Sequence, residues 1–470
     1  MEKKFDFAMI GLGVMGRNLL LNMADNGFAV VGFDKDETKT NALESSATAG
    51  TIVKGVNTLE EMVASLAKPR KIIMLVPAGK PVDDVLSSLQ PLLEKEDVII
   101  DGGNSHYTDT MRRIESQKAF GFHFMGMGIS GGEQGARTGP SIMPGGDASA
   151  YKNVQPVLEA IAAKEGPESC VAYMGKGAAG HYVKMVHNGI EYAIMQILGE
   201  VYDILKRGKG IGNAELHALF AGWNKGDLQS YLIEITAAVF LQKDETSDAD
   251  LVDKILDVAG SKGTGKWTSQ SAMDLGMGIP VIDAAVTMRS ISGLKTDRVK
   301  AAGLYLSPEK NIATDKETIT QQMHDALFSA IVICYAQGLA LLQKASIDLD
   351  MQIPLQDAVK VWRQGCIIRS AMLGLFYKVT NNNPGISNIL LDTEIAALIN
   401  DKIKGLRSIV VAATEAGIPN MALSNALNYF DAFTTDRLPL NLTQAQRDFF
   451  GAHTYQRIDK EGIFHTHWNG

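Results

Sequence analysis

The feature that most constrains the fold of this chain is a glycine-rich turn near its N-terminus, GLGVMG at residues 11–16. An apolar run at 5–10 leads into the turn and has the length of a short buried strand, whereas residues 17–26 have the pattern of a helix. A second apolar run at 29–33 follows, and Asp34 comes directly after it. Strand, glycine turn, helix and strand in this order predict the parallel βαβ unit that opens a doubly wound α/β domain.

The three glycines of the turn have separate roles in such a unit. Gly11 permits the tight turn, Gly13 lets a pyrophosphate approach the backbone, and Gly16 lets the helix pack closely on the strand. The first N–H groups of the helix face the phosphates. The turn alone is a weak signal. Together with both strands, the helix and Asp34, it predicts a Rossmann-type domain that binds a nicotinamide or flavin dinucleotide.

Further strands and loops extend this prediction to a whole sheet. Strands are expected at 72–76, 98–101, 121–124 and 171–173. Ligands of such sheets bind beyond the carboxyl ends of the strands. Glycine-containing loops are expected there at 76–79, 101–105 and 126–132. Each loop alone is compatible with a plain turn, but three at one edge favour ligand binding, because glycine permits close approach and consecutive N–H groups can hold an anion.

The second half of the chain has a different pattern. From about residue 178 to 433 the alternation typical of strands disappears, and long segments such as 180–207 and 316–344 have helical periodicity. Two similar segments, at 219–223 and 358–362, indicate a weak internal duplication. We therefore expect an α/β Rossmann-type N-terminal domain, a large all-α domain and a C-terminal tail. Their expected bounds are 1–178, 179–436 and 437–470.

One face of the first long helix carries a set of polar side chains. Lys184, His187, Asn188 and Glu191 are spaced i, i+3, i+4 and i+7, so they share a face, with Tyr192 at its margin. This face offers a base, an acid and hydrogen-bonding groups. It is either a solvated face with one Lys–Glu pair or part of a site, and the stretch alone does not decide between the two.

Two other segments carry candidate anion-binding groups. GSKGTGKW at 260–267 nearly matches the phosphate loop of nucleotide hydrolases, but Trp267 stands where a Ser or Thr must hold magnesium, and the preceding 251–259 looks helical. A loop that holds a substrate phosphate, with Arg289 as a bidentate partner, is the favoured interpretation. The tail adds QRDFFGAH at 446–453.

Composition narrows the class of protein. The net charge of −8 gives no general attraction to nucleic acid or anionic membrane. No apolar run has the length expected of a membrane span, and the N-terminus lacks the layout of a signal peptide. Three cysteines, Cys170, Cys334 and Cys366, make no disulfide or metal-binding pattern. We expect a cytoplasmic protein without a metal and without nucleic-acid or membrane partners.

Six motifs in this order resemble the decarboxylating 6-phosphogluconate dehydrogenases of the pentose phosphate pathway, and the resemblance covers essentially the whole chain. The motifs are GLGVMGRNLLLNM, DGGNS, SGGEQGARTGPSIMPGG, GHYVKMVHNGIEY, GSKGTGKWT and QRDFFGAHTY. The resemblance implies oxidation and decarboxylation of 6-phosphogluconate to ribulose 5-phosphate, with NADP as the usual cofactor and no metal. It also implies a homodimer in which each tail reaches the partner subunit.

The resemblance also implies roles for individual residues. Lys184 would take the proton of the C3 hydroxyl and then stabilise the ketone oxygen, and Glu191 would protonate the carbon that becomes C1 of ribulose 5-phosphate. Contacts to the sugar acid are expected from Asn104, Ser130, Gly131, Gly132, His187 and Asn188. A phosphate clamp is expected from Tyr192, Lys262, Arg289 and Arg447. In the family, the equivalents of Arg447 and His453 come from the partner subunit.

The chain departs from the family where the adenosine end of the cofactor binds. Gly13 replaces an alanine, Asp34-Lys35-Asp36 replaces Asn-Arg-Thr, and Pro77 replaces a common lysine. A carboxylate at Asp34 suits a ribose diol and repels a 2′-phosphate, so we expect NAD or dual use rather than strict NADP preference. The residues expected at the cofactor are Gly11, Leu12, Gly13, Val14, Met15, Gly16, Asp34, Lys35, Asp36, Val76, Pro77, Ala78 and Asn104.

Two alternatives remain open at this point. The first is a β-hydroxyacid dehydrogenase that does not release carbon dioxide, which the chain length, Glu191 and the basic residues Lys262, Arg289 and Arg447 disfavour. The second is a catalytically silent dinucleotide-binding scaffold, which the presence of both Lys184 and Glu191 disfavours.

Overall fold

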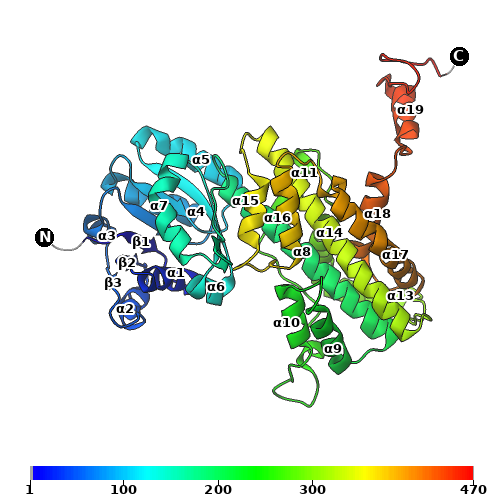
Figure 1. Cartoon of the computed structure of the whole chain (residues 1–470), viewed down its shortest axis with the longest axis horizontal. Helices are drawn as coiled ribbons and strands as arrows, with labels where there is room; N and C mark the ends of the chain where they lie inside the picture. Colours follow the sequence, from blue (N-terminus) through cyan, green and yellow to red (C-terminus); the bar gives the residue numbers. More distant parts are fainter. Residues whose placement is uncertain (1–3, 469–470) are drawn as a thin grey trace.

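The computed structural model describes residues 4–468, which form a sheet-based part, a helical part and a projecting tail (Figure 1). The main sheet has the strand order β3-β2-β1-β4-β5-β6-β7. Its strands are β1 (Phe7–Ile10), β2 (Val30–Phe33), β3 (Val53–Gly55), β4 (Lys71–Met74), β5 (Val98–Asp101), β6 (His123–Ser130) and β7 (Ser141–Gly145). All neighbours pair in parallel except β6 and β7, which are antiparallel. The predicted α/β Rossmann-type domain is therefore confirmed.

Helices cover both faces of this sheet. They are α1 (Val14–Asp25), α2 (Glu37–Ser45), α3 (Leu59–Ser65), α4 (Lys80–Leu89), α5 (Tyr107–Gln117), α6 (Gly132–Thr138) and α7 (Ala148–Ile161). Side chains of α1 and α7 share one hydrophobic core with one face of the sheet, whereas side chains of α3 and α4 share another with the opposite face. A short hairpin, β8 (Lys164–Glu165) and β9 (Glu168–Ser169), follows. Strand burial on both faces explains why the apolar runs are continuous rather than alternating.

The glycine-rich segment that was predicted as a loop at 126–132 is mostly strand, because β6 continues to Ser130. Two of its glycines are needed for packing. A Cβ on Gly126 would lie 2.7 Å from the His181 ring, and a Cβ on Gly128 would lie 2.3 Å from the Lys184 Cβ. Both partners belong to the first helix of the helical part, which therefore lies directly on β6. The strand predicted at 171–173 was wrong, since only an isolated bridge between Ile142 and Val171 forms there.

The helical part confirms the predicted all-α domain. Its helices are α8 (Ala179–Asp203), continued by a π-helical turn (Ile204–Gly208), then α9 (Asn213–Trp223), α10 (Tyr231–Val239), α11 (Thr264–Asp274), α12 (Pro280–Gly293), α13 (Lys295–Leu304), α14 (Lys316–Asp348), α15 (Leu355–Trp362), α16 (Met372–Asn382), α17 (Thr393–Glu415) and α18 (Met421–Phe433). The α14 helix runs through the centre and packs against α8, α17 and α18. Asp315 caps it by accepting from the N–H of Thr318 at 2.9 Å.

The α14 helix corrects the statement from the sequence that no apolar run has the length of a membrane span. By length and composition it could cross a membrane, and it is the one helix among residues 4–468 of which this is true. Because 94% of its most apolar window is buried inside the protein, its apolar character is accounted for by the core.

The prediction of a helix at 251–259 was also wrong. The segment contains one 3₁₀ turn, Leu251–Asp253, and is otherwise irregular up to α11. Tertiary ion pairs hold it instead, since Asp257 accepts from Lys295 at 2.5 Å and from Arg298 at 2.9 Å. These contacts outside the segment override its local periodicity.

The tail carries α19 (Leu440–Gly451), which projects from the end of α18 away from the helical part (Figure 1). Its structure is organised by Asp448, which is fully buried. The Asp448 carboxylate accepts from the N–H groups of Thr454 and Thr466 at 2.9 and 3.0 Å, and from the Trp468 indole at 2.9 Å. The tail is therefore a folded unit, although it lies outside the body of its own chain.

Candidate active site

The polar stripe of α8 is buried, which rules out the solvated face that the sequence left open. Lys184 is 6% exposed and its Nζ lies 3.4 Å from the His187 Nδ1. The Nδ1 lies 3.1 Å from the Asn188 Oδ1 and 3.9 Å from a Glu191 carboxylate oxygen. The Nε2 on the other side of the ring lies 3.4 Å from the hydroxyl of Ser130, at the end of β6. One connected cluster thus joins the helix to the carboxyl edge of the sheet.

Burial shifts the three ionisable groups of the stripe, Lys184, His187 and Glu191, towards their neutral forms. It lowers the pKa of Lys184, an effect that the negative charge of Glu191 opposes in part. It raises the pKa of Glu191, opposed by the positive charges of Lys184 and Arg289. It also lowers the pKa of His187 well below its usual value, so that this ring is neutral. A neutral amine and a protonated carboxylic acid are the forms needed for a general base and a general acid.

One predicted loop begins beside this cluster, and a second is joined to the same helix through His181. Gly131 and Gly132 follow Ser130 and lead into α6, and Gly131 requires a glycine because its φ is +130° and a Cβ would lie 2.7 Å from the carbonyl oxygen of Gly365. Asn104 is exposed in a loop whose flanking residues are buried. Asp101 holds that loop, as described below. Both loops therefore lie at the carboxyl edge of the sheet, where the sequence predicted contacts to the sugar acid.

The predicted phosphate clamp is partly assembled within the chain. The Tyr192 hydroxyl accepts from the N–H of Lys262 at 3.3 Å, and the Arg289 guanidinium stacks 3.3 Å from the centre of the Tyr192 ring. Asn188 donates to the Thr264 hydroxyl at 3.2 Å, which ties the same loop to α8. These contacts place the Arg289 guanidinium and the backbone of Lys262 beside the stripe, where a phosphate can be held.

Two predicted members of the site are not brought to it within one chain. Arg447 and His453 lie on the projecting tail, both with exposed side chains, and the Arg447 guanidinium donates to Gln444. Four large apolar residues of α19 are also exposed, Leu440 at 55%, Leu442 at 62%, Phe449 at 54% and Phe450 at 73%.

Most of the predicted cofactor residues line or flank a separate pocket of about 360 Å³ at the first strand ends, whereas Asp36 and Asn104 do not line it. Those that line it are Gly11, Gly13, Asp34, Lys35, Val76 and Pro77. Leu12 is buried beneath the turn, Val14 and Met15 belong to the first turn of α1, Gly16 is buried, and Ala78 is exposed in the next loop. The first N–H groups of α1 have no side-chain cap, since Gly13 occupies the N-cap position. Such free donors fit a pyrophosphate.

The glycines of the turn differ in what requires them. Gly11 has φ +93°, and a Cβ on Gly16 would lie 1.9 Å from the Gly11 carbonyl oxygen. A Cβ on Gly13 would meet nothing within 4 Å, so the protein itself leaves room for a side chain there. The fold therefore requires glycine at positions 11 and 16. At position 13 glycine is needed only where a bound ligand must approach the backbone closely.

The acid at the second strand end is already engaged by the protein. Asp34 accepts from the N–H of Leu12 at 2.7 Å and from the N–H of Asp36 at 2.9 Å. The Asp36 side chain caps α2 by accepting from Thr38. Lys39, which sequence reasoning missed, lies with its Nζ 3.7 Å from Asp34 and lines the same pocket. Its position three residues after the cap of α2 is the signal that would have found it.

The fold and site together define a two-domain dehydrogenase with a dinucleotide pocket and a helical substrate domain. Residues 6–175 match the family model described as the NAD binding domain of 6-phosphogluconate dehydrogenase, and residues 180–468 match its C-terminal domain. The chain belongs to the 6-phosphogluconate dehydrogenase family. Among residues 4–468, no group of three or more His, Cys, Asp and Glu side chains is arranged to hold a metal.

Similar proteins cover the full length of the chain. The decarboxylating, NADP(+)-dependent 6-phosphogluconate dehydrogenase of Bacillus subtilis is 48% identical, with 99% of each chain covered. The decarboxylating enzyme of Synechocystis is 47% identical, covering 99% of this chain and 98% of its own. The solved structure of Plasmodium falciparum 6-phosphogluconate dehydrogenase, described with NADP+ and with its substrate 6-phosphogluconate, superposes with a TM-score of 0.95 at 42% identity, covering 98% of this chain and all of that one.

Proposed function

We propose that this chain converts 6-phospho-D-gluconate to D-ribulose 5-phosphate and carbon dioxide while reducing a nicotinamide dinucleotide. The observation that carries the proposal is the buried pair Lys184 and Glu191, whose pKa shifts favour a neutral base and a protonated acid. Family membership supports the same reaction. The bound dinucleotide supplies the hydride acceptor.

Lys184 acts first as a base and then as an acid. The neutral amine takes the proton of the C3 hydroxyl as the C3–H bond loses its hydride, which leaves a 3-keto acid. The resulting ammonium then donates a hydrogen bond to the ketone oxygen, where the electrons of the breaking C1–C2 bond collect as carbon dioxide leaves. The positive charge on Nζ stabilises the negative charge on this oxygen most strongly in a buried setting, because no water competes for the oxygen.

Glu191 completes the reaction by supplying a proton to carbon. The enediol that remains after the loss of carbon dioxide needs a proton on the carbon that lost its carboxylate, and protonated Glu191 is the acid of the cluster. Two helical turns separate it from Lys184, which suits proton transfer at two different carbons of one substrate. The remaining sugar-acid contacts, Asn104, Ser130, Gly131, Gly132, His187 and Asn188, orient the chain of the substrate.

The active unit that we propose is a homodimer in which the tails are exchanged. Arg447 and His453 stand outside the cluster of their own chain, and the folded tail exposes an apolar helix face that a second copy can bury. In this arrangement each site receives Arg447 and His453 from the partner and uses them with Tyr192, Lys262 and Arg289 to hold the 6-phosphate.

For the cofactor we propose that NAD is used at least as well as NADP. The carboxylate of Asp34 is held at the pocket by two backbone N–H groups, in a position that suits a ribose diol. Lys35 and Lys39 lie at the same pocket and reduce the penalty for a 2′-phosphate. We also propose a cytoplasmic location, because the three cysteines are free and buried and so suit a reducing compartment.

Substrate labelled at C1 tests the reaction and separates it from its alternatives. Release of labelled carbon dioxide in equal amount to the reduced dinucleotide is the expected result. Dinucleotide reduction without carbon dioxide would indicate a β-hydroxyacid dehydrogenase. Dinucleotide binding with neither product would indicate a scaffold.

A further inference from the structure

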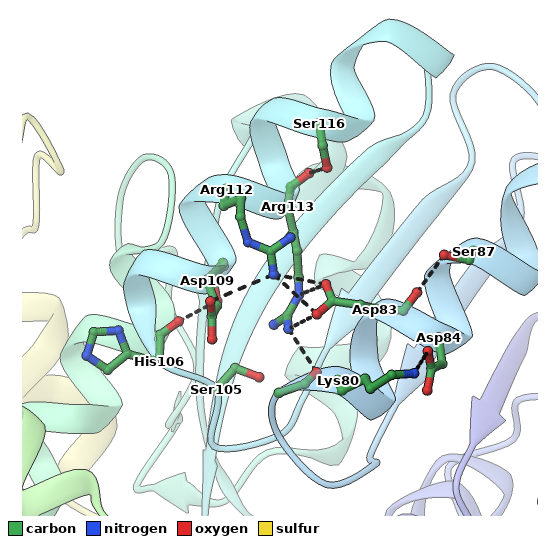
Figure 2. A network of polar contacts seen from close by, with 12 residues as sticks. Lys80, Asp83, Asp84, Ser87, Ser105, His106, Asp109, Arg112, Arg113 and Ser116 are labelled. Carbon is green, nitrogen blue, oxygen red and sulfur yellow. Dashed lines mark hydrogen bonds and ion pairs between the residues drawn. The ribbon is translucent and has the colours of Figure 1, made fainter.

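A buried arginine that none of the proposed chemistry uses joins the two ligand loops of the sheet. Arg113, on α5, is 1% exposed. Its Nε and Nη2 donate to the two carboxylate oxygens of Asp83 at 2.8 and 3.1 Å, as Figure 2 shows, and its Nη2 also donates to the carbonyl oxygen of Gly79 at 3.0 Å. Gly79 ends the cofactor loop 76–79 and caps α4, on which Asp83 lies.

The other side of the same guanidinium faces the substrate loop. Its Nη1 lies 3.8 Å from the carboxylate of Asp101, which is fully buried at the end of β5, and this nitrogen has no hydrogen-bond partner among the described residues. The Asp101 carboxylate accepts from the N–H of Gly103 at 3.0 Å and from the Ser105 hydroxyl at 2.6 Å. Asp101 therefore fixes the residues on both sides of Asn104.

A third contact extends the network to the catalytic helix. Burial lowers the pKa of His181, so its ring is neutral. Its Nε2 donates to the carbonyl oxygen of Asp101 at 3.0 Å, and its Nδ1 lies 2.7 Å from the hydroxyl of Thr110 on α5. His181 is one helical turn from Lys184. The loop at 101–105 is thus held between Arg113 and α8.

The charges of this network are unequally matched. Two buried or half-buried carboxylates share one guanidinium, which makes a bidentate pair with Asp83 but reaches Asp101 only at ion-pair distance. A small movement of Asp101 or of α5 would turn that ion pair into a hydrogen bond to the free Nη1. Binding a ligand on either loop can drive such a movement, and the other loop is tied to the same group.

We propose that Arg113 is a positioning residue that couples cofactor binding to substrate binding by tying loop 76–79 to loop 101–105. The proposal rests on the function proposed above and adds to it the physical route between the two binding sites. In this view each ligand orders the other ligand's loop, so each binds more tightly when the other is present. Coupling of this kind is reciprocal.

The neighbouring arginine provides a matched control. Arg112 also donates to both oxygens of Asp83, at 3.0 and 3.2 Å, and lies beside Arg113 in Figure 2. It is 56% exposed and makes no contact with Gly79 or Asp101. Replacing Arg112 removes the same charge from the same carboxylate but leaves the link between the loops.

The experiment measures binding without turnover. The reduced dinucleotide is titrated by its fluorescence with and without 6-phosphogluconate, which cannot be oxidised by a cofactor that is already reduced. In the wild-type enzyme we expect each ligand to tighten the other at least about fivefold. In Arg113→Met this factor falls to below about twofold, with each ligand alone bound within a few-fold of wild type, and in Arg112→Met it is retained.

Three results would overturn the proposal: absence of coupling in the wild type, retention of full coupling in a folded Arg113→Met, or equal loss in Arg112→Met, which would assign the effect to the charge on Asp83. If Arg113→Met does not fold, Arg113→Lys takes its place in the test, because a lysine paired with Asp83 cannot also reach Gly79 and Asp101. Full coupling between the two ligands in Arg113→Lys would then refute the proposal. Failure of the proposed function is distinguishable, since it would remove carbon dioxide release from the wild type itself.

Discussion

Replacing Asp34 with asparagine should move cofactor preference from NAD towards NADP. The change removes one negative charge where the second strand ends and keeps the size of the side chain. An asparagine oxygen can still accept from the N–H of Leu12, but its amide nitrogen cannot accept from the N–H of Asp36. One hydrogen bond worth about 1 kcal/mol is lost. That loss affects both cofactors alike and cancels in their ratio.

The charge effect does not cancel. A 2′-phosphate carries nearly two negative charges, and at about 5 Å from the carboxylate it is repelled by about 1.5–6.5 kcal/mol for effective dielectric constants between about 80 and 20. The Asp34 side chain is only 13% exposed, which favours the upper part of that range. Lys39, 3.7 Å from the carboxylate, offsets part of it. A net change of at least about 1.4 kcal/mol remains, which is about tenfold in affinity.

The assay is the ratio of kcat/KM for NADP to kcat/KM for NAD, measured on wild type and variant at one ionic strength. Asp36→Asn is the matched control, because Asp36 carries the same charge two residues away but is 46% exposed and caps α2, where asparagine is equally acceptable. We expect a rise of at least about tenfold for Asp34→Asn and a clearly smaller one for the control. A wild-type preference of a hundredfold for NADP, or equal ratios in both variants, would refute the reasoning, since the lysines would then outweigh the carboxylate.

Three further predictions concern the proposed catalytic groups. Lys184→Met should lower kcat by at least about 10²–10⁴-fold while dinucleotide binding, followed by fluorescence titration, changes only a few-fold; near wild-type oxidation would require another base. Because Lys184 must be neutral and Glu191 protonated, the rate should fall as pH drops through the lowered pKa of Lys184 and as it rises through the raised pKa of Glu191. Glu191→Gln should slow turnover and remove the decline at high pH. An unchanged pH profile in this variant would exclude Glu191 as the acid. A chain lacking residues 438–470 should be inactive alone but regain activity when mixed with Lys184→Met chains, because one site of the heterodimer combines an intact Lys184 with a borrowed tail; heterodimers without activity would mean that the tail acts within its own chain.

Local patterns were sufficient to predict the fold class and the position of the polar stripe. The turn at 11–16 and the strands around it can be recognised from contiguous residues alone, because the strands of a buried parallel sheet are continuous apolar runs. The spacing of Lys184 and Glu191 likewise requires only that the segment be helical, and α8 satisfies it. Most features that depend on 3.6-residue or strand periodicity are local and were predicted well, but the helix expected at 251–259 and the strand expected at 171–173 do not form.

Features that depend on contacts between distant segments were not predictable in the same way. The glycines at 126 and 128 looked like those of a loop because the packing of α8 on β6 is absent from the sequence. The stripe on α8 could not be assigned as buried until Ser130 and the loop at 260–265 were placed against it. The hydrogen bond from the N–H of Leu12 to Asp34 arises from the fold of the turn itself.

The close packing of α8 on β6 has a consequence for how such an enzyme can be recombined. Lys184 belongs to the helical part by sequence, but it is buried against a strand of the dinucleotide domain, at a position where even one added carbon on Gly128 would collide with it. The reactivity of the proposed base is therefore a property of the junction and not of either half. Exchanging the dinucleotide domain for another of the same architecture would give an active enzyme with a new cofactor preference only if the residues of β6 that contact α8 were retained. This junction is therefore a poor crossover point for chimeras.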